Sequence, residues 1–445
     1  MATIDKTVEI IFSGKDDVSR VMRGIRGGLS DLEGVAEAVA RPLAQVANAV
    51  LAADATLAGL AAGGLALAIR AAGEFQQGFG EISTLIDASE DDLADFEQAV
   101  RQYAATSTQS WDEVQQAVYN AISAGVDYRH SLDLVAQAEK LAVAGRANLN
   151  DTTVLLVSTM NAYGASTDEA ARYSDILFQT VRQGQTTIPQ LAQSLAQVTG
   201  TAAGASVPFE EIAAAIATLT AAGLPTSQAI TAIKAALSNI LKPASQATKL
   251  AGELGIQFDA AALKSKGFSG VLADVARATG GNVDKLGQLF GSVEALNGVL
   301  ILAGTGADAF RANLEAMGQS AGSTQTAFEK MAGNVDLAMQ RVKNAAFSAL
   351  SQIGQPFIDE FNNIADAISA VFAAVGQSFD AGSFDPLIQV VEDAARAIDS
   401  LLDDIAANLP QALEQIDWSP ITDNLRNLGD ALSQIFGGLD LSTTE

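Results

Sequence analysis

Apolar side chains recur every three or four positions from Val18 to Leu67. A period near 3.5 residues, kept over many turns, is typical of helices that wind around one another. The alternative is a single amphipathic helix lying on a globular core. Gly27 and Pro42 weaken the pattern, because glycine lowers helix stability and proline kinks a helix. The predicted coiled-coil seam consists of Val18, Met22, Ile25, Leu29, Leu32, Val39, Leu43, Val46, Val50 and Leu57.

Residues 49–69 form an apolar segment with one charged side chain, Asp54. The segment is long enough to span a bilayer, and its small residues, such as Gly59 and Gly63, allow helices to pack closely. Alanine and glycine drive membrane insertion weakly, which favours the alternative of a helix buried or self-associated in an aqueous assembly. Candidate membrane contacts are Leu57, Leu60, Leu65, Leu67 and Ile69.

The middle of the chain has a regular spacing of glycines and helix-capping residues. Each interval predicts a helix of roughly 13–16 residues that ends at glycine and is followed by a new cap. The series predicts stacked helical hairpins, and Ser110 with Glu113 has the spacing of a capping box. The glycines are Gly125, Gly145, Gly164, Gly184, Gly204 and Gly223, and the expected caps are Ser131, Asn150 or Asp151, Thr167, Thr187 and Thr226.

The pattern as a whole predicts an all-α protein, in which long coiled-coil-like helices flank a central helical-hairpin bundle. One short N-terminal strand is expected at residues 7–13, which are rich in β-branched side chains. A second heptad seam runs through residues 347–375. The predicted parts are an arm (1–14), a coiled-coil helix (15–74), a core (75–310), amphipathic helices (311–375), a linker (376–386) and acidic C-terminal helices with a tail (387–445).

Composition narrows the classes of function. The chain of 445 residues has no cysteine, so it contains no disulfide or thiolate metal site. Its formal net charge is −26, which opposes nonspecific binding to nucleic acid or an anionic membrane. The acidic residues concentrate towards the C-terminus, where residues 355–445 have only Arg396 and Arg426 as bases.

No pattern of catalytic or metal-binding residues stands out. The single histidine, His130, is expected in a solvated loop before Ser131, and no nucleophile elbow, phosphate loop or zinc motif is present. Adjacent acid pairs such as Glu210 and Glu211 suit the first turn of a helix, where negative charge interacts favourably with the helix dipole. The sequence therefore predicts a protein that is not an enzyme and holds no cofactor or metal.

The central block resembles the core region of phage tail tape measure proteins. The similarity begins at FQQGFGEISTLIDAS from Phe75 and continues through residues 119–145 and 191–258, closing at LGQLFGSVEALNGVLIL (286–302). The opening GKDDVSRVMRGIRGGLSDLEG also looks like the start of such a protein. Some members carry a peptidoglycan-cleaving domain; no such domain is recognisable in this sequence, so that activity is not expected.

The resemblance implies a multi-copy helical rod that sets tail length, scaffolds tube assembly, fills the tail-tube lumen of the virion and is ejected ahead of the genome. Expected partners are further copies of the chain, as a trimer or hexamer, the major tail tube protein, tail assembly chaperones and tail tip proteins. The host inner membrane is a candidate partner on ejection, and specific nucleic-acid binding is not expected. Assembly would take place in the host cytoplasm. A continuous helix of this length would extend roughly 650–700 Å.

A different class of function also fits the apolar helix and the coiled coil: a membrane-active, pore-forming or toxin component. A cytosolic helical-repeat adaptor is a third. Leakage of liposomes caused by the protein alone would favour the membrane-active class, whereas neighbouring tail genes would favour the ruler.

Overall fold

The computed structural model describes residues 55–358, and within this range the chain forms helices and no strand, which confirms the all-α class. The predicted N-terminal strand, most of the first seam and the linker at 376–386 lie outside the described residues. The first helices are α3 (Ala55–Ser83), α4 (Glu90–Thr106), α5 (Trp111–Ser123), α6 (Tyr128–Gly145), α7 (Leu149–Tyr163), α8 (Ala170–Gln183), α9 (Ile188–Ser194) and α10 (Ala196–Gly204).

The later helices continue the series. A π-helical turn at Ile301–Thr305 links two of them, and 3₁₀ turns lie at Thr167–Glu169 and Gln355–Phe357. These helices are α11 (Phe209–Ala221), α12 (Thr226–Leu241), α13 (Ser245–Leu254), α14 (Ala260–Thr279), α15 (Val283–Leu289), α16 (Val293–Leu300), α17 (Ala307–Gly318), α18 (Ser323–Ala332) and α19 (Val335–Gly354).

Local sequence signals place most of the helix ends. The capping box of Ser110 and Glu113 opens α5 as predicted, and Thr187 caps α9 by accepting a hydrogen bond from the Gln190 N–H. Gly164 ends α7 in the left-handed conformation, with φ of 64°. Here the residue identities alone determine where the backbone leaves the helix.

Other cap predictions were wrong by one to four residues. Asp127 caps α6 in place of Ser131, which puts His130 inside the first helical turn, where it is exposed. Asn148 caps α7 in place of Asn150 or Asp151. Each true cap has the correct side-chain chemistry but lies upstream of the expected position, because Asn and Asp can cap wherever the backbone first turns.

Three further expectations were also imprecise. Ser166 precedes the turn that leads into α8, and Pro225 precedes α12, so both boundaries lie one residue before the predicted threonines. Between Gly184 and Gly204 the chain forms two short helices instead of one, with a break at Leu195.

The chain divides into two units, which are described separately. Of the described residues, unit 1 contains 55–74 and 349–358, and unit 2 contains 75–348. In the described part of unit 1, Ala68, Ala71 and Ala72 of α3 are buried. A Cβ atom at Gly354 would collide with the carbonyl group of Ala68. Helices α3 and α19 therefore contact each other backbone to backbone, which only glycine permits at position 354.

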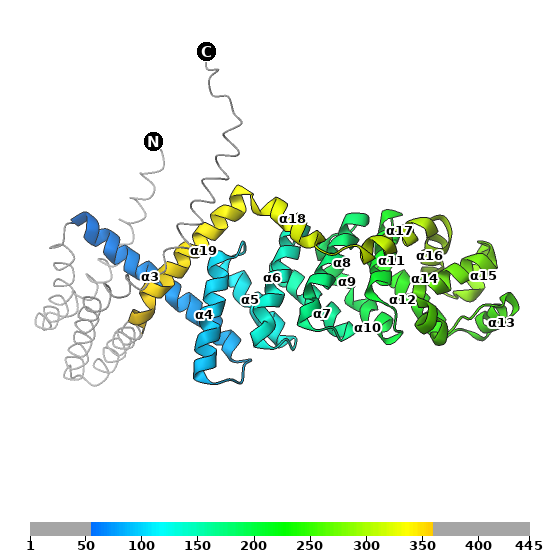
Figure 1. Ribbon diagram of the computed structural model, residues 1–445, viewed down its shortest axis with the longest axis horizontal. Coiled ribbons are helices and arrows are strands. Elements are labelled where there is room, and N and C mark those ends of the chain that lie inside the picture. The colour runs from blue at the N-terminus through cyan, green and yellow to red at the C-terminus, as the bar shows by residue number, and fades with distance from the viewer. Residues whose placement is uncertain (1–54, 359–445) are drawn as a thin grey trace, which may run out of the picture. The chain divides into compact units, whose positions relative to one another are not determined.

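In unit 2, helices α4 to α16 stand side by side approximately in chain order (Figure 1). The Ala-rich helix α11 lies among α8, α12 and α17, and Ile212, Ile216 and Leu219 are almost completely buried. The helices α17 and α18 then return along the stack, α17 against α11 and α18 against α6 and α8. The chain therefore comes back towards the helices from which unit 2 starts.

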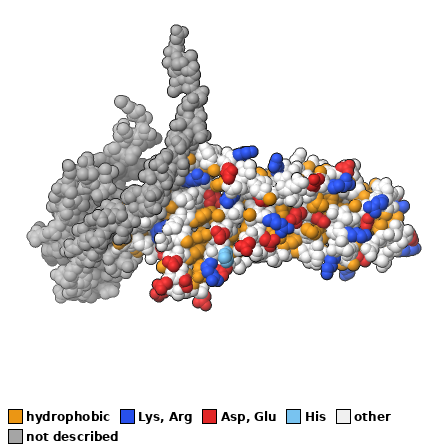
Figure 2. Space-filling model, in the orientation of Figure 1, with side chains coloured by type: hydrophobic (Ala, Val, Ile, Leu, Met, Phe, Trp, Pro, Cys, Tyr) orange, Lys and Arg blue, Asp and Glu red, His pale blue; other side chains and the backbone are white. Residues whose placement is uncertain are grey.

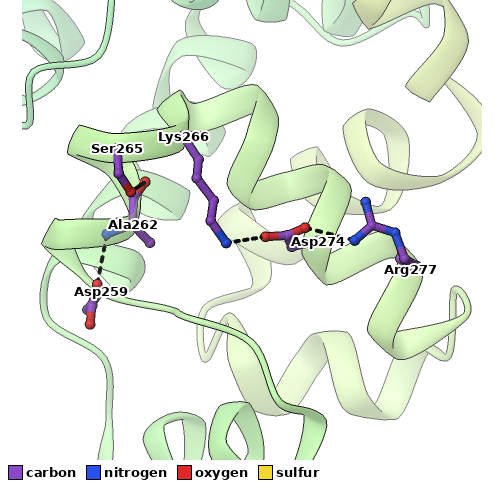
Figure 3. A network of polar contacts seen from close by, with 6 residues as sticks. All are labelled: Asp259, Ala262, Ser265, Lys266, Asp274 and Arg277. Atoms are coloured by element: carbon purple, nitrogen blue, oxygen red, sulfur yellow. Dashed lines mark hydrogen bonds and ion pairs between the residues drawn. The ribbon is translucent and has the colours of Figure 1, made fainter.

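Helix α14 is broken at Gly267, where φ is 72° and ψ is 178°. Two ion pairs meet at Asp274 beyond the break: Lys266 Nζ lies 2.7 Å from its carboxylate and Arg277 lies 3.0 Å away (Figure 3). These interactions lower the pKa of Asp274, the hydrogen bond from Lys266 most strongly. Asp259 caps the first half of the helix by accepting the Ala262 N–H at 2.8 Å.

Replacement of Gly267 by alanine is expected to destabilise the protein. The new Cβ would occupy the position of the Glu211 carboxylate and would need a positive φ, which costs a non-glycine residue about 1–3 kcal/mol. Thermal unfolding followed by circular dichroism measures the change. The matched control is Gly252→Ala in exposed α13, where no atom lies within 4 Å and the helix should gain up to about 1 kcal/mol. Equal melting temperatures for both variants would contradict the role of Gly267.

Candidate functional site

The loop of residues 107–111 between α4 and α5 is the point at which distant parts of unit 2 meet. Trp111 opens α5 and is 6% exposed. Its indole ring contacts the ring of Phe75 at a centroid distance of 5.2 Å and that of Phe347 at 5.0 Å. Its Nε1–H donates a hydrogen bond of 3.1 Å to the carbonyl oxygen of Asn344. One indole therefore joins the start of the described part of unit 2 to its last helix.

Asn344 of α19 fixes the same loop from the other side. Its side chain is buried, and the amide Nδ2 donates to the carbonyl oxygens of Ser107 at 2.9 Å and Gln109 at 2.6 Å. Both carbonyl groups lie in a non-helical segment and would otherwise lack a backbone partner. The Asn344 amide thus supplies the hydrogen-bond donor that these two carbonyl groups would find in a regular helix or strand.

Glu139 of α6 supplies the acceptors that the loop needs. Its carboxylate is buried and accepts hydrogen bonds from Ser107 Oγ at 2.8 Å, from the Thr108 N–H at 2.7 Å and from Thr108 Oγ1 at 2.5 Å. The Tyr103 hydroxyl donates to the same carboxylate. Burial, together with the adjacent negative charge of Glu139, raises the pKa of Tyr103 well above its usual value. The phenol therefore stays protonated and remains a donor.

Phe75 is held by polar groups as well as by the indole. The guanidinium of Arg101 stacks over its ring at 3.8 Å from the centroid and pairs with Glu97 at 2.8 Å. Burial lowers the pKa of Arg101, an effect that the pairing with Glu97 opposes. The Gln115 amide donates to the Phe75 carbonyl oxygen at 3.0 Å. The segment that leads into unit 2 is therefore fixed at both its backbone and its side chain.

Two further buried carboxylates cap helices far away in the sequence. Asp175 of α8 accepts the Gly322 N–H at 2.7 Å and the Thr324 N–H at 2.8 Å, at the start of α18. Glu211 of α11 accepts the N–H groups of Phe268 at 2.5 Å and Ser269 at 3.0 Å, where α14 restarts after its break. Burial raises the pKa of Glu211, and the hydrogen bonds from Ser269 and Phe268 oppose the shift.

The carboxylates of Glu139, Asp175 and Glu211 already accept hydrogen bonds from backbone N–H groups. Together with Trp111 and Asn344 they form a structural joint that holds distant segments of unit 2 together. Within the described range 55–358, no group of three or more histidine, cysteine or acidic side chains could hold a metal ion. On the face seen in Figure 2, acidic side chains gather over the start of α4, whose first turn contains Glu90, Asp91 and Asp92. Ser89 caps that turn, so these acids have a local role at a helix N-terminus.

Most of the residues predicted to form the coiled coil or to contact a membrane do not belong to this joint. The seam residues Val18 to Val50 lie outside the described residues. Leu57, Leu60 and Leu65 belong to α3. In the same helix Leu67 is 58% exposed and Ile69 is partly buried. The coiled-coil contacts and the membrane contacts therefore stay predictions.

No single helix between residues 55 and 358 is both long and apolar enough to cross a bilayer. Two consecutive segments, Val293–Thr305 and Ala307–Gly318, meet the criterion only when taken together, and they are bent by 86°. The side chains of Val299, Leu302 and Phe310 in these segments are buried within unit 2.

The chain is similar to known phage tail proteins. Residues 97–291 match the family described as phage-related minor tail protein. The chain is 25% identical over 441 residues to the probable tape measure protein of Clostridium phage phiCD119, an alignment that covers 94% of this chain and 46% of that protein. The chain is similar to phage tail tape measure proteins. This confirms the resemblance found in the central block.

Two other relatives have the same designation. The tape measure protein of Pneumococcus phage Dp-1 is 24% identical over 69% of this chain and 27% of its own length. The probable tape measure protein of Escherichia phage P2 is 26% identical over 41% of this chain and 23% of its own length. The chain thus spans about half or less of the length of these tape measure relatives. No solved structure matches it.

The sequence pattern did not reveal the joint. Trp111 was visible only as an isolated aromatic residue, and Glu211 only as a favourable charge in a first turn. Asn344 is one polar residue within an amphipathic helix. Its position carried no signal, because Gln340 and Arg341 lie one turn before it on α19 and Phe347 is the only apolar residue one turn after it.

Replacement of Asn344 by alanine is expected to destabilise unit 2 by about 1–3 kcal/mol, because the carbonyl groups of Ser107 and Gln109 lose their buried donor. Urea unfolding followed by tryptophan fluorescence measures the loss. The control is Lys343→Ala on the exposed side of the same helix, for which a change within about 0.5 kcal/mol is expected. A loss no larger than that of the control would contradict the role of Asn344.

Glu211 predicts a pH dependence of stability. Its pKa in the folded protein is raised above the ordinary value of 4.5, so the folded state binds a proton more tightly than the unfolded state. The free energy of unfolding should therefore fall as pH rises from 4.5 through the folded pKa. Glu211→Gln removes this dependence. Unfolding curves between pH 4 and 7 should show the stability of the variant, relative to wild type, increasing with pH; a constant difference would contradict the assignment.

Proposed function

We propose that this chain acts as a tail tape measure protein, in which helical segments flanking unit 2 convert residue number into tail length. The observation that carries the proposal is the alignment of 94% of the chain with a protein designated a probable tape measure protein. The heptad seams at 18–57 and 347–375 support it, because a helix rises by a constant amount of about 1.5 Å per residue. None of the three relatives has a name that describes an enzyme.

The proposal also covers where the protein acts and which proteins it binds. The chain would assemble in the host cytoplasm, occupy the lumen of the tail tube and leave ahead of the genome. Its partners would be other copies of itself along the seam, as a trimer or hexamer, with the major tail tube protein, tail assembly chaperones and tail tip proteins. The net charge of −26 supports a lumen protein that does not retain DNA, since like charges repel.

The segment 49–69 is the proposed membrane contact during ejection. The exposed side chain of Leu67 supports this assignment. Leu67 is expected to contact acyl chains of the host inner membrane, together with Leu57, Leu60, Leu65 and Ile69 of the same helix. The close backbone packing of α3 at Ala68 is also compatible with helix association in lipid, where small residues allow close approach.

The length function can be tested by inserting four heptads copied from the second seam after residue 375. The addition of 28 residues should lengthen tails by about 42 Å, the helical rise of the insert. Negative-stain electron microscopy of many virions measures the mean length. The control replaces residues 362–375 with two other heptads of the same length and should leave the tail unchanged. Tails of wild-type length after the insertion would reject the ruler function of this segment.

A further inference from the structure

The chain enters and leaves the described part of unit 2 at the same place. Phe75 is the first residue of this unit, and Phe347 is one residue from the end of its described part. Both rings contact Trp111, at centroid distances of 5.2 and 5.0 Å. Two points separated by more than 270 residues in the sequence are therefore joined through a single indole.

Hydrogen bonds on both sides of the indole fasten this closure. The amide of Gln115 holds the Phe75 backbone, and Asn344 holds the 107–111 loop through its side chain and its carbonyl oxygen. The returning helices are fixed before they reach this point, because Asp175 caps α18. The closure is thus built from specific buried polar contacts and does not depend on apolar packing alone.

Unit 1 shows the same pairing of distant segments. Gly354 of α19 is buried, and it faces the carbonyl group of Ala68 of α3 at a distance that excludes a Cβ atom. The segment before unit 2 and the segment after it therefore lie in contact with each other. Unit 1 therefore pairs the segment before residues 75–348 with the segment after them, and unit 2 pairs the two ends of the 75–348 region itself.

We propose that residues 75–348 form a closed side domain that adds nothing to the length measured by the ruler, and that Asn344 and Trp111 hold it closed. This inference rests on the proposed tape measure function. As one continuous helix, these residues would extend roughly 400 Å. In the closed domain, the two ends are separated only by the width of an indole and its neighbours. The ruler would then consist of the flanking segments alone.

Tail length separates this inference from the proposed function. A flexible 28-residue Gly/Ser insertion between Gly280 and Gly281 would enter a turn where both glycines are exposed and have positive φ, a type of site that tolerates insertions. A closed domain predicts tails of wild-type length. An extended domain predicts longer tails, by about 30 Å for a flexible coil of this length, and that result would overturn the inference.

The four-heptad insertion after residue 375 is the comparison. Longer tails with that insertion, together with unchanged tails with the Gly280–Gly281 insertion, support both the ruler and the closed domain. If both insertions lengthen the tail, the ruler stands and the closed domain is rejected. If the heptad insertion has no effect, the proposed ruler itself fails, whatever the second insertion does.

A distance measurement on the purified full-length chain tests the closure directly. The chain has no cysteine, so spin labels attach only to cysteines introduced at Gln76 and Lys343, both exposed. Wild type should give one short, narrow distance distribution in pulsed electron paramagnetic resonance, and Asn344→Leu should broaden and lengthen it. Gln102→Leu, on the exposed face of α4, is the control and should leave the distribution unchanged.

A second variant keeps this measurement informative if Asn344→Leu does not fold. Trp111→Phe retains an aromatic ring against Phe75 and Phe347 but removes the Nε1–H donor to Asn344, and it should broaden the distribution to a smaller degree. A broad or long distribution in the wild-type chain would overturn the closure. An unchanged distribution in both variants would show that these two residues do not hold it.

Discussion

The structure depends on one constraint: backbone polar groups that become buried where helices stop must find partners elsewhere. A stack of short helices has many ends, and each end leaves N–H or carbonyl groups without partners inside the helix. In unit 2 the buried carboxylates of Glu139, Asp175 and Glu211 accept such N–H groups. Asn344 donates to the carbonyl groups of the 107–111 loop. An unsatisfied group at any of these sites would cost about as much as a lost hydrogen bond.

These contacts also explain how a chain so rich in small residues acquires a defined arrangement. Alanine-rich surfaces such as that of α11 allow helices to approach closely, but they offer few distinctive shapes. The hydrogen bonds of the buried polar side chains are directional, so each side chain fits only one set of partners. Gly267 illustrates this specificity. At the break in α14, the carboxylate of Glu211 occupies the space that a side chain at position 267 would need. Packing brings the helices together, and the polar pairs determine which helix lies where.

The closure around Trp111 relates the fold to the proposed function. A measuring rod needs segments whose length is proportional to residue number, and the compact unit between residues 75 and 348 does not have this property when it is closed. A helical heptad seam on either side would have it, because a helix has a constant rise. The region that matches phage-related minor tail proteins, residues 97–291, lies entirely within the compact unit. The most recognisable part of the chain is therefore distinct from the part proposed to measure length.

The sequence by itself determined the class of structure and several of its local boundaries. The spacing of Gly125, Gly164 and Gly223, and the Ser110–Glu113 box, depend on backbone preferences within a few residues, which are readable without a structure. Only the tertiary structure decided which side chains complete the buried ends. Asn344 and Ser107 are 237 residues apart, and Glu211 and Phe268 are 57 apart. Local periodicity contains no information about such pairs, because they exist only once the whole stack has formed.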